Sequence, residues 1–398
     1  MLTSLALVFL AGLALAEVCQ RLNLPRIIGM LITGILLGPY VLDLFDSSIL
    51  SISADLRRMA LVIILIKAGL SLNIEDLKRV GRPAILMSFL PAVFEILAFL
   101  LFAPLVLKVD HIEAAIMGAV LGAVSPAVVV PRMVQLMDER YGTDKRIPQM
   151  ILAGASLDDV FVIVLFSTFV SIAQGGSAQI MDFVNIPVSI ILGVFLGAVT
   201  GFLLAWFFEI NYIHRRLIRN SVKVIIVLGV SFLLLAVEDW LEGIVSVSGL
   251  LAIMSMALIL AMRSAPEVTR RLQEKYGKLW LAAEVILFVL VGAAVDIRYT
   301  LQAGAGAVLM IAVGLLFRCA GVWLCMLGTR LNRKERLYCM IAYLPKATVQ
   351  AAIGSIPLAL GLPCGNMVLS VAVLSILITA PLGAIGMDMS YKKLLKFE

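Results

Sequence analysis

Long apolar runs constrain this chain more than any other feature. Runs of about 18–24 mostly apolar residues recur along the whole sequence, and each can cross a hydrocarbon layer of about 30 Å as an α-helix. Hydrophobic residues make up 62% of the 398 residues and charged residues only 15%, which is too little charge for the surface of a water-soluble protein. Alternating short strands, typical of an outer-membrane barrel, are not visible. The sequence therefore predicts an all-α polytopic protein integral to the lipid bilayer.

The apolar runs are predicted to form thirteen transmembrane helices. The run nearest the N-terminus lacks the basic leader and cleavage site of a signal peptide, so it counts as a span. The spans lie near residues 3–19, 27–44, 58–73, 84–107, 112–131, 149–173, 186–209, 221–238, 243–262, 278–296, 303–327, 337–358 and 365–388.

Basic residues are distributed unevenly among the connections between these spans. Most lysines and arginines lie in the odd-numbered connections and after the last span, whereas the even-numbered connections carry only Arg57, Arg58, Lys108 and Arg298. The positive-inside rule predicts a cytoplasmic C-terminus and an external N-terminus, and we expect a bacterial inner (plasma) membrane. Because the net charge of +6 comes from these loop residues, it does not indicate a nucleic-acid partner.

The sequence also resembles itself. Three pairs of stretches correspond in the same order and at nearly the same spacing: KAGLSLNI (67–74) with LVGAAVDI (290–297), Phe94-Glu95 with Phe317-Arg318, and AVSPAVVV (123–130) with AYLPKATV (342–349). The shift is an odd number of spans, which predicts two inverted six-helix repeats, about 1–175 and about 220–390, and a linker helix at about 186–209. Inverted repeats are typical of secondary carriers with a site near mid-membrane, and the chain has no P-loop motif for a pump.

The fifth and twelfth spans are predicted to be broken helices. The fifth contains Ser125 and Pro126, and the twelfth contains Pro345 and Gly354, in equivalent places of the two repeats. Proline removes a backbone donor and leaves a carbonyl group without its helical partner, and in lipid that group needs another partner. Simple kinks are the alternative interpretation, but matched breaks in both repeats favour a carrier site.

Charged residues inside the spans are few and balanced in sign. Away from the span ends, the bases are Lys67, Arg318 and Lys346, and the acids are Glu95, Asp158 and Asp159; Glu284 lies about two turns into the tenth span, and we assign it no role. Ionised groups at this depth are costly and usually functional. We expect Lys67 to reach toward the membrane surface or to pair with Glu75 or Asp76.

The adjacent Asp158 and Asp159 are the strongest site candidate. With the hydroxyl groups of Ser125 or Thr348 and freed backbone carbonyls, they offer the hard oxygen ligands that alkali cations prefer. A purely structural ion pair between this couplet and Lys346 is the alternative.

Three stretches in this order, GAVSPAVVVP, AGASLDDV and YLPKATVQAAIG, resemble the monovalent cation:proton antiporter superfamily, specifically its NHA-type sodium/proton antiporters. The resemblance covers nearly the whole chain. It implies a thirteen-helix homodimer, with a dimerisation domain and a mobile core built from spans 4–6 and 11–13, in which broken helices 5 and 12 cross.

The resemblance also implies roles for individual residues. Asp159 would be the principal ion and proton ligand, and Asp158 would assist it. Lys346 matches the lysine of the PKATVQ stretch, and Glu95 with Arg318 would form a structural or gating ion pair. Electrogenic members usually combine Asp-Asp with a lysine where this chain has Arg318, and electroneutral members combine Asn-Asp with an arginine, so the stoichiometry stays open.

These observations predict a secondary active transporter that exchanges Na⁺ or Li⁺ for H⁺ by alternating access, with cation and proton competing for Asp158 and Asp159. The alternatives are a K⁺/H⁺ exchanger of the same fold and a Na⁺-coupled organic-anion symporter of the bile-acid-carrier type.

Other functional classes lack support in the sequence. A channel would need a repeated selectivity filter or a ring of like charges, and neither is visible. No enzyme motif such as HExxH or GxSxG lies in a span, and the scattered cysteines and two histidines predict no cofactor or resident metal.

Overall fold

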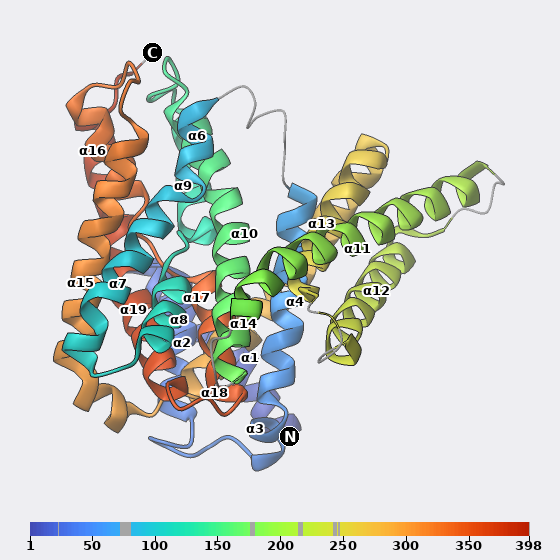
Figure 1. Cartoon of the computed structure of the whole chain (residues 1–398), viewed down its shortest axis with the longest axis horizontal. Helices are drawn as coiled ribbons and strands as arrows, with labels where there is room; N and C mark the ends of the chain where they lie inside the picture. Colours follow the sequence, from blue (N-terminus) through green and yellow to red (C-terminus); the bar gives the residue numbers. More distant parts are fainter. Residues whose placement is uncertain are drawn as a thin grey trace. The chain divides into compact units, whose positions relative to one another are not determined.

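The computed structural model describes residues 1–22, 24–71, 81–175, 180–213, 218–241, 245 and 247–397. These residues are mainly helical and form no β-strand; Tyr141 and Phe397 make an isolated antiparallel bridge. The helices are α1 (Leu2–Arg21), α2 (Arg26–Leu37), α3 (Ser47–Ser51), α4 (Ser53–Ser71), α6 (Arg82–Met87), α7 (Leu90–Leu107), α8 (His111–Leu121), α9 (Pro126–Asp138), α10 (Ile147–Gln174), α11 (Ile180–Ile213), α12 (Asn220–Leu241), α13 (Gly249–Arg263), α14 (Pro266–Ala293), α15 (Ile297–Cys325), α16 (Arg333–Ala342), α17 (Thr348–Gly354), α18 (Ile356–Ala359) and α19 (Gly365–Leu394) (Figure 1).

In the described residues, 8 helical segments are long and apolar enough to cross a membrane by length and composition. Each predicted span overlaps at least one helix, while the count of thirteen and the inverted-repeat layout stay predictions.

Several helices begin or end at other residues than the predicted spans, for local reasons. Helix α2 ends at Leu37 rather than near 44, because Gly38 is extended before Pro39 and a residue before proline disfavours the helical conformation. Helix α14 begins at Pro266 rather than near 278, since proline suits a first helical turn.

The fourth predicted span is interrupted, which the sequence analysis did not anticipate. Helix α6 ends at Met87 and α7 begins at Leu90. Pro91 explains the break, because it has no N–H for the Met87 carbonyl and its ring crowds that group. The Ser88 hydroxyl donates to the Ile85 carbonyl at 2.6 Å, so it satisfies one of the groups at the end of α6.

The chain divides into two compact units. The first contains Met1–Arg57, Asn73–Ala173 and Val285–Glu398. In it α7 packs along α15 and α8, and α19 contacts α8, α15, α16 and α17. The predicted spans 4–6 and 11–13 all fall in this unit, together with α1 and α2. Glu95, Asp158, Asp159, Arg318 and Lys346 therefore all lie in one compact unit.

The second unit contains Arg58–Leu72 and Gln174–Glu284. Helix α11 packs closely on α13 through glycines that recur every four residues. A Cβ atom at Gly193 would lie 2.6 Å from the Ser248 carbonyl oxygen, and a Cβ atom at Gly197 or Gly201 would overlap backbone carbonyls of α13. Small residues at this spacing allow the close backbone approach that is common between membrane helices.

Candidate functional site

Two interrupted helices of the first unit meet at their breaks. Helix α8 ends at Leu121 and α9 begins at Pro126, while α16 ends at Ala342 and α17 begins at Thr348. The breaks contact directly, because the Ser125 N–H donates to the Pro345 carbonyl at 2.8 Å. Each break therefore supplies a partner for a backbone group that the other leaves free, as burial in an apolar environment demands.

Gln350 strengthens this contact from α17. Its Nε2 donates to the Ala123 carbonyl at 2.8 Å, and its Oε1 accepts from the Ala347 N–H at 2.7 Å. Thr379 on α19 adds a third link, since its hydroxyl accepts from the Lys346 N–H at 2.9 Å. The sequence analysis did not identify Gln350 or Thr379. Both residues could have been recognised as polar side chains within an apolar run, because polar groups at membrane depth need partners inside the protein.

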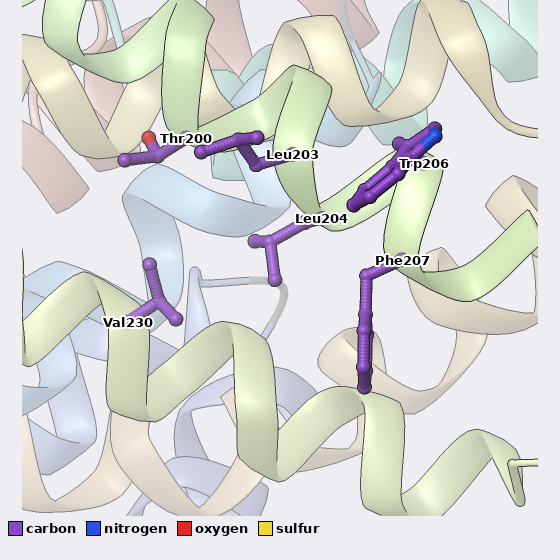
Figure 2. A pocket seen from close by; sticks show the side chains of 6 residues that line it. All are labelled: Thr200, Leu203, Leu204, Trp206, Phe207 and Val230. Atoms are coloured by element: carbon purple, nitrogen blue, oxygen red, sulfur yellow. The ribbon is translucent and has the colours of Figure 1, made fainter. Parts of the chain in front are cut away.

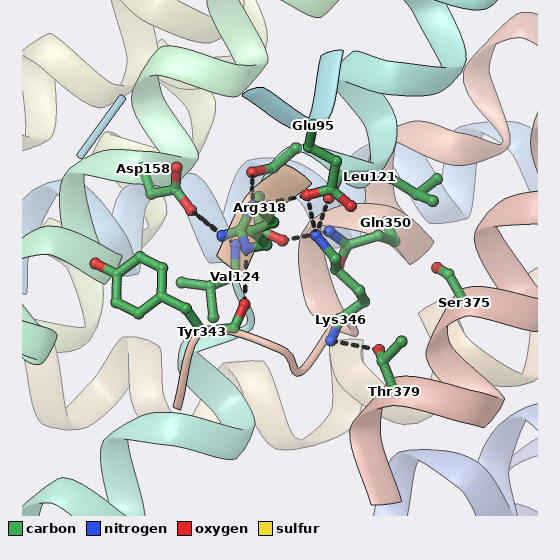
Figure 3. Close-up of polar contacts among 12 residues, drawn as sticks. Glu95, Leu121, Val124, Asp158, Arg318, Tyr343, Lys346, Gln350, Ser375 and Thr379 are labelled. Atoms are coloured by element: carbon green, nitrogen blue, oxygen red, sulfur yellow. Dashed lines mark hydrogen bonds and ion pairs between the residues drawn. The ribbon is translucent and has the colours of Figure 1, made fainter. Parts of the chain in front are cut away.

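Arg318 on α15 is the centre of the buried ion pairs. Its Nη1 lies 2.9 Å from Glu95 Oε2 and its Nη2 lies 2.9 Å from Asp158 Oδ2. Its Nε donates to the Tyr343 carbonyl at 2.7 Å, and Nη1 also donates to the Gly122 carbonyl (Figure 3). The side chain is fully buried. One planar guanidinium thus joins the acid of α7, the acid of α10 and both breaks, a geometry that lysine cannot reproduce.

Lys346, in the second break, binds Glu95 rather than the aspartate couplet. Its Nζ lies 2.5 Å from Glu95 Oε2 and also donates to the Leu121 carbonyl, the last residue of α8. The expected pair of Glu95 and Arg318 is present. The alternative, an ion pair between the couplet and Lys346, is not seen among the described residues, because Asp158 pairs with Arg318 instead. The two cations also occupy the carbonyl groups that the first break leaves free.

The couplet retains oxygen atoms without a partner. Asp158 Oδ2 accepts from the Val124 N–H at 2.8 Å and from Arg318, whereas Oδ1 of both Asp158 and Asp159 has no hydrogen-bond partner in the described part of the chain. The hydroxyl groups of Ser125 and Thr348 are also buried and unpartnered there. Asp158 is 0% exposed and Asp159 is 7% exposed. Unpaired buried oxygens of this kind suit a small hard cation or a proton as substrate.

Elsewhere in the described residues, the structure offers no comparable set of ligands for a cation. They contain no group of three or more His, Cys, Asp or Glu side chains that could hold a resident metal ion. A pocket of about 350 Å³ between α11 and α12 is lined by apolar side chains and one threonine: Thr200, Leu203, Leu204, Trp206, Phe207 and Val230 (Figure 2). The Thr200 hydroxyl already donates to the Leu196 carbonyl at 2.9 Å. This pocket therefore offers no charged ligand.

The remaining predicted residues are placed as follows. Pro126 is the first residue of α9 and Pro345 lies in the second break. Lys67 lies in the second unit with its Nζ 5.9 Å from the centre of the Trp280 ring. Glu75 and Asp76, its expected partners, fall outside the described residues.

The chain is similar to known transporters over nearly its whole length. Residues 5–388 match the family described as sodium/hydrogen exchanger, transmembrane. The sequence is 33% identical over 384 residues to human sodium/hydrogen exchanger 9B2. The matched region covers 94% of this chain and 70% of that protein. Human sodium/hydrogen exchanger 9B1 is 30% identical over 384 residues, and the match covers 94% of this chain and 73% of that protein. The structure of the sodium proton antiporter MjNhaP1 from Methanocaldococcus jannaschii matches with a TM-score of 0.84 over 99% of this chain and 98% of that chain, at 23% identity, and so shares the fold.

Proposed function

The chain belongs to the sodium/hydrogen exchanger family, and from this premise we propose that it exchanges Na⁺ or Li⁺ for H⁺ across the membrane by alternating access at Asp158 and Asp159. The observation that carries the proposal is the set of unpaired, buried oxygen atoms beside the two breaks. Asp158, Asp159, Ser125 and Thr348 each contribute one. Alkali cations and protons bind such oxygen atoms, and no cofactor takes part in this exchange.

The buried charges support a site for one positive charge. Glu95, Asp158 and Asp159 carry three negative charges, and Arg318 and Lys346 carry two positive charges. The cations pair with Glu95 and Asp158, so one negative charge is left for Asp159. One monovalent cation or one proton neutralises it. We therefore assign Asp159 as the principal ligand of cation and proton, and Asp158 as the assisting ligand.

The same charge balance gives a reason for obligatory exchange. An occupied site is neutral overall, whereas an empty site carries a net negative charge, which is costly to move through an apolar barrier. In this mechanism the core of spans 4–6 and 11–13 carries the occupied site between the two faces of the membrane. Glu95, Arg318 and Lys346 stay paired during the movement and hold the two breaks together.

The larger arrangement completes the proposal. Thirteen spans form two inverted repeats and a linker helix, and two copies of the chain form a homodimer. The protein lies in a bacterial inner membrane with an external N-terminus and a cytoplasmic C-terminus. The distribution of basic residues in the connections supports this orientation.

Proteoliposomes that contain a pH-sensitive dye test the proposal. We expect Na⁺ or Li⁺ to move protons across wild-type vesicles, and K⁺ to do so weakly or not at all. Asp159→Asn should abolish this exchange because it removes the charge that the cation neutralises. Asp144→Asn, at an exposed loop position, is the matched control and should behave as wild type. Full activity of Asp159→Asn would refute the assignment, and a response to K⁺ alone would favour a K⁺/H⁺ exchanger.

A further inference from the structure

Tyr343 lies beside the buried ion pairs, but its hydroxyl takes no part in them. The residue caps the end of α16, just before the second break, and is fully buried. Its carbonyl accepts the 2.7 Å hydrogen bond from Arg318 Nε, and its ring centre lies 5.5 Å from the guanidinium carbon of Arg318. The Tyr343 hydroxyl has no hydrogen-bond partner among the described residues. An unpaired buried donor costs stability, so a use for it in another step of transport would explain its presence.

The hydroxyl approaches α10 one helical turn before Asp158. A Cβ atom at Gly154 would overlap the Tyr343 hydroxyl, so the glycine makes this close approach possible. Helical side chains lean toward the N-terminus of their helix, which directs the Asp158 carboxylate back over the turn of Gly154. Figure 3 shows the Tyr343 ring and Asp158 on the same side of Arg318. The unpaired donor thus lies against α10 at Gly154, one helical turn before Asp158 on the same helix.

Asp158 has one oxygen atom that is free to accept a hydrogen bond. Oδ2 is occupied by the Val124 N–H at 2.8 Å and by Arg318 Nη2 at 2.9 Å, while Oδ1 has no partner in the part of the chain that the structure describes. Oδ1 is therefore the oxygen that Asp158 can offer to a cation. Once a cation leaves, Oδ1 stays buried and charged, and a new hydrogen-bond donor stabilises it.

Resting on the function proposed above, we propose that Tyr343 is a positioning residue whose hydroxyl donates a hydrogen bond to Asp158 Oδ1 when the site holds no cation. Hydroxyl and cation then compete for the same oxygen atom. The hydrogen bond stabilises the empty, ionised site, so it weakens cation binding and favours release. A hydrogen bond of ordinary net strength changes an affinity by roughly three- to tenfold.

Tyr343→Phe tests this role because it removes the hydroxyl and keeps both the ring and the backbone carbonyl. In proteoliposomes at alkaline pH, we expect the apparent KM for Li⁺ or Na⁺ to fall by roughly three- to tenfold. The melting temperature in detergent should stay the same or rise, because the hydroxyl has no partner in this structure. Damage to the site would instead raise KM, so the direction of the change separates the two effects.

Two further variants complete the experiment. Tyr338→Phe is the matched control, since Tyr338 is a buried tyrosine of the same helix, and it should keep the wild-type KM. Ser125→Ala removes a proposed cation ligand and should raise KM, the opposite change. An unchanged or raised KM in Tyr343→Phe would overturn the inference. If wild-type vesicles exchange cations for protons, Asp159→Asn does not, and Tyr343→Phe keeps the wild-type KM, then only the role of Tyr343 fails; inactive wild-type vesicles would refute the proposed function itself.

Discussion

Arg318 provides a direct test of the buried ion pairs. Arg318→Met keeps a long side chain but removes the donor that Asp158, Glu95 and two backbone carbonyls share. Lys346 still pairs with Glu95 in this variant. Asp158 is therefore the residue that mainly loses its ion-pair partner, and it stays buried and charged without a counter-ion. Breaking a buried pair in this way costs about 3–5 kcal/mol. We therefore expect the free energy of unfolding to fall by that amount, and the melting temperature to fall by roughly 4–6 °C.

Thermal unfolding of the purified protein in detergent, followed by tryptophan fluorescence, measures this change. Arg330→Met, at an exposed position, is the matched control and should melt within about 1 °C of wild type. The double variant Arg318→Met/Asp158→Asn removes the unpaired charge, so it should recover a large part of the lost stability. If Arg318→Met melts like wild type, or the double variant melts below the single one, Arg318 is not the counter-ion of Asp158.

Two more variants test how the breaks are held. Gln350→Leu leaves the Ala123 carbonyl and the Ala347 N–H without the partners they now have; we expect a loss of about 1–3 kcal/mol in unfolding free energy and slower cation exchange, and an unchanged melting temperature would contradict this role. Gly154→Ala places a methyl group on the Tyr343 hydroxyl and should cost about 1–3 kcal/mol. Adding Tyr343→Phe should restore part of that loss in the same thermal assay, and no recovery would mean that the overlap is not the cause.

Much of the helical framework could be predicted, because length and apolar composition suffice to identify a membrane-spanning helix. The ends of the helices were less predictable where proline decides them. The sequence contains the signal for the break between α6 and α7 in Pro91, and for the end of α2 in Pro39. The polar first half of α14 was missed because it lies outside the apolar run, although it is helical from Pro266.

The composition of the candidate site was also predictable, but its pairing was not. Charges within apolar runs identified Glu95, Asp158, Asp159, Arg318 and Lys346. An ion pair between Lys346 and the aspartates was the alternative interpretation of the couplet. In the structure Arg318 reaches Asp158 from α15, and Lys346 turns to Glu95 on α7. Both cations also bind carbonyl groups of the first break, so backbone acceptors helped to decide the pairing.

The sequence by itself determined that this chain forms membrane helices, that two of its spans are broken, and that a small set of charges of both signs is buried. The family resemblance that it indicated is confirmed by the match over residues 5–388. Tertiary structure alone decided which charges meet. The partners of Arg318 are 160 and 223 positions away in the sequence, and Gln350 donates across 227 positions. Hydrophobicity is a local property that a single segment displays, whereas such contacts depend on how several helices pack, and short-range patterns do not encode that packing.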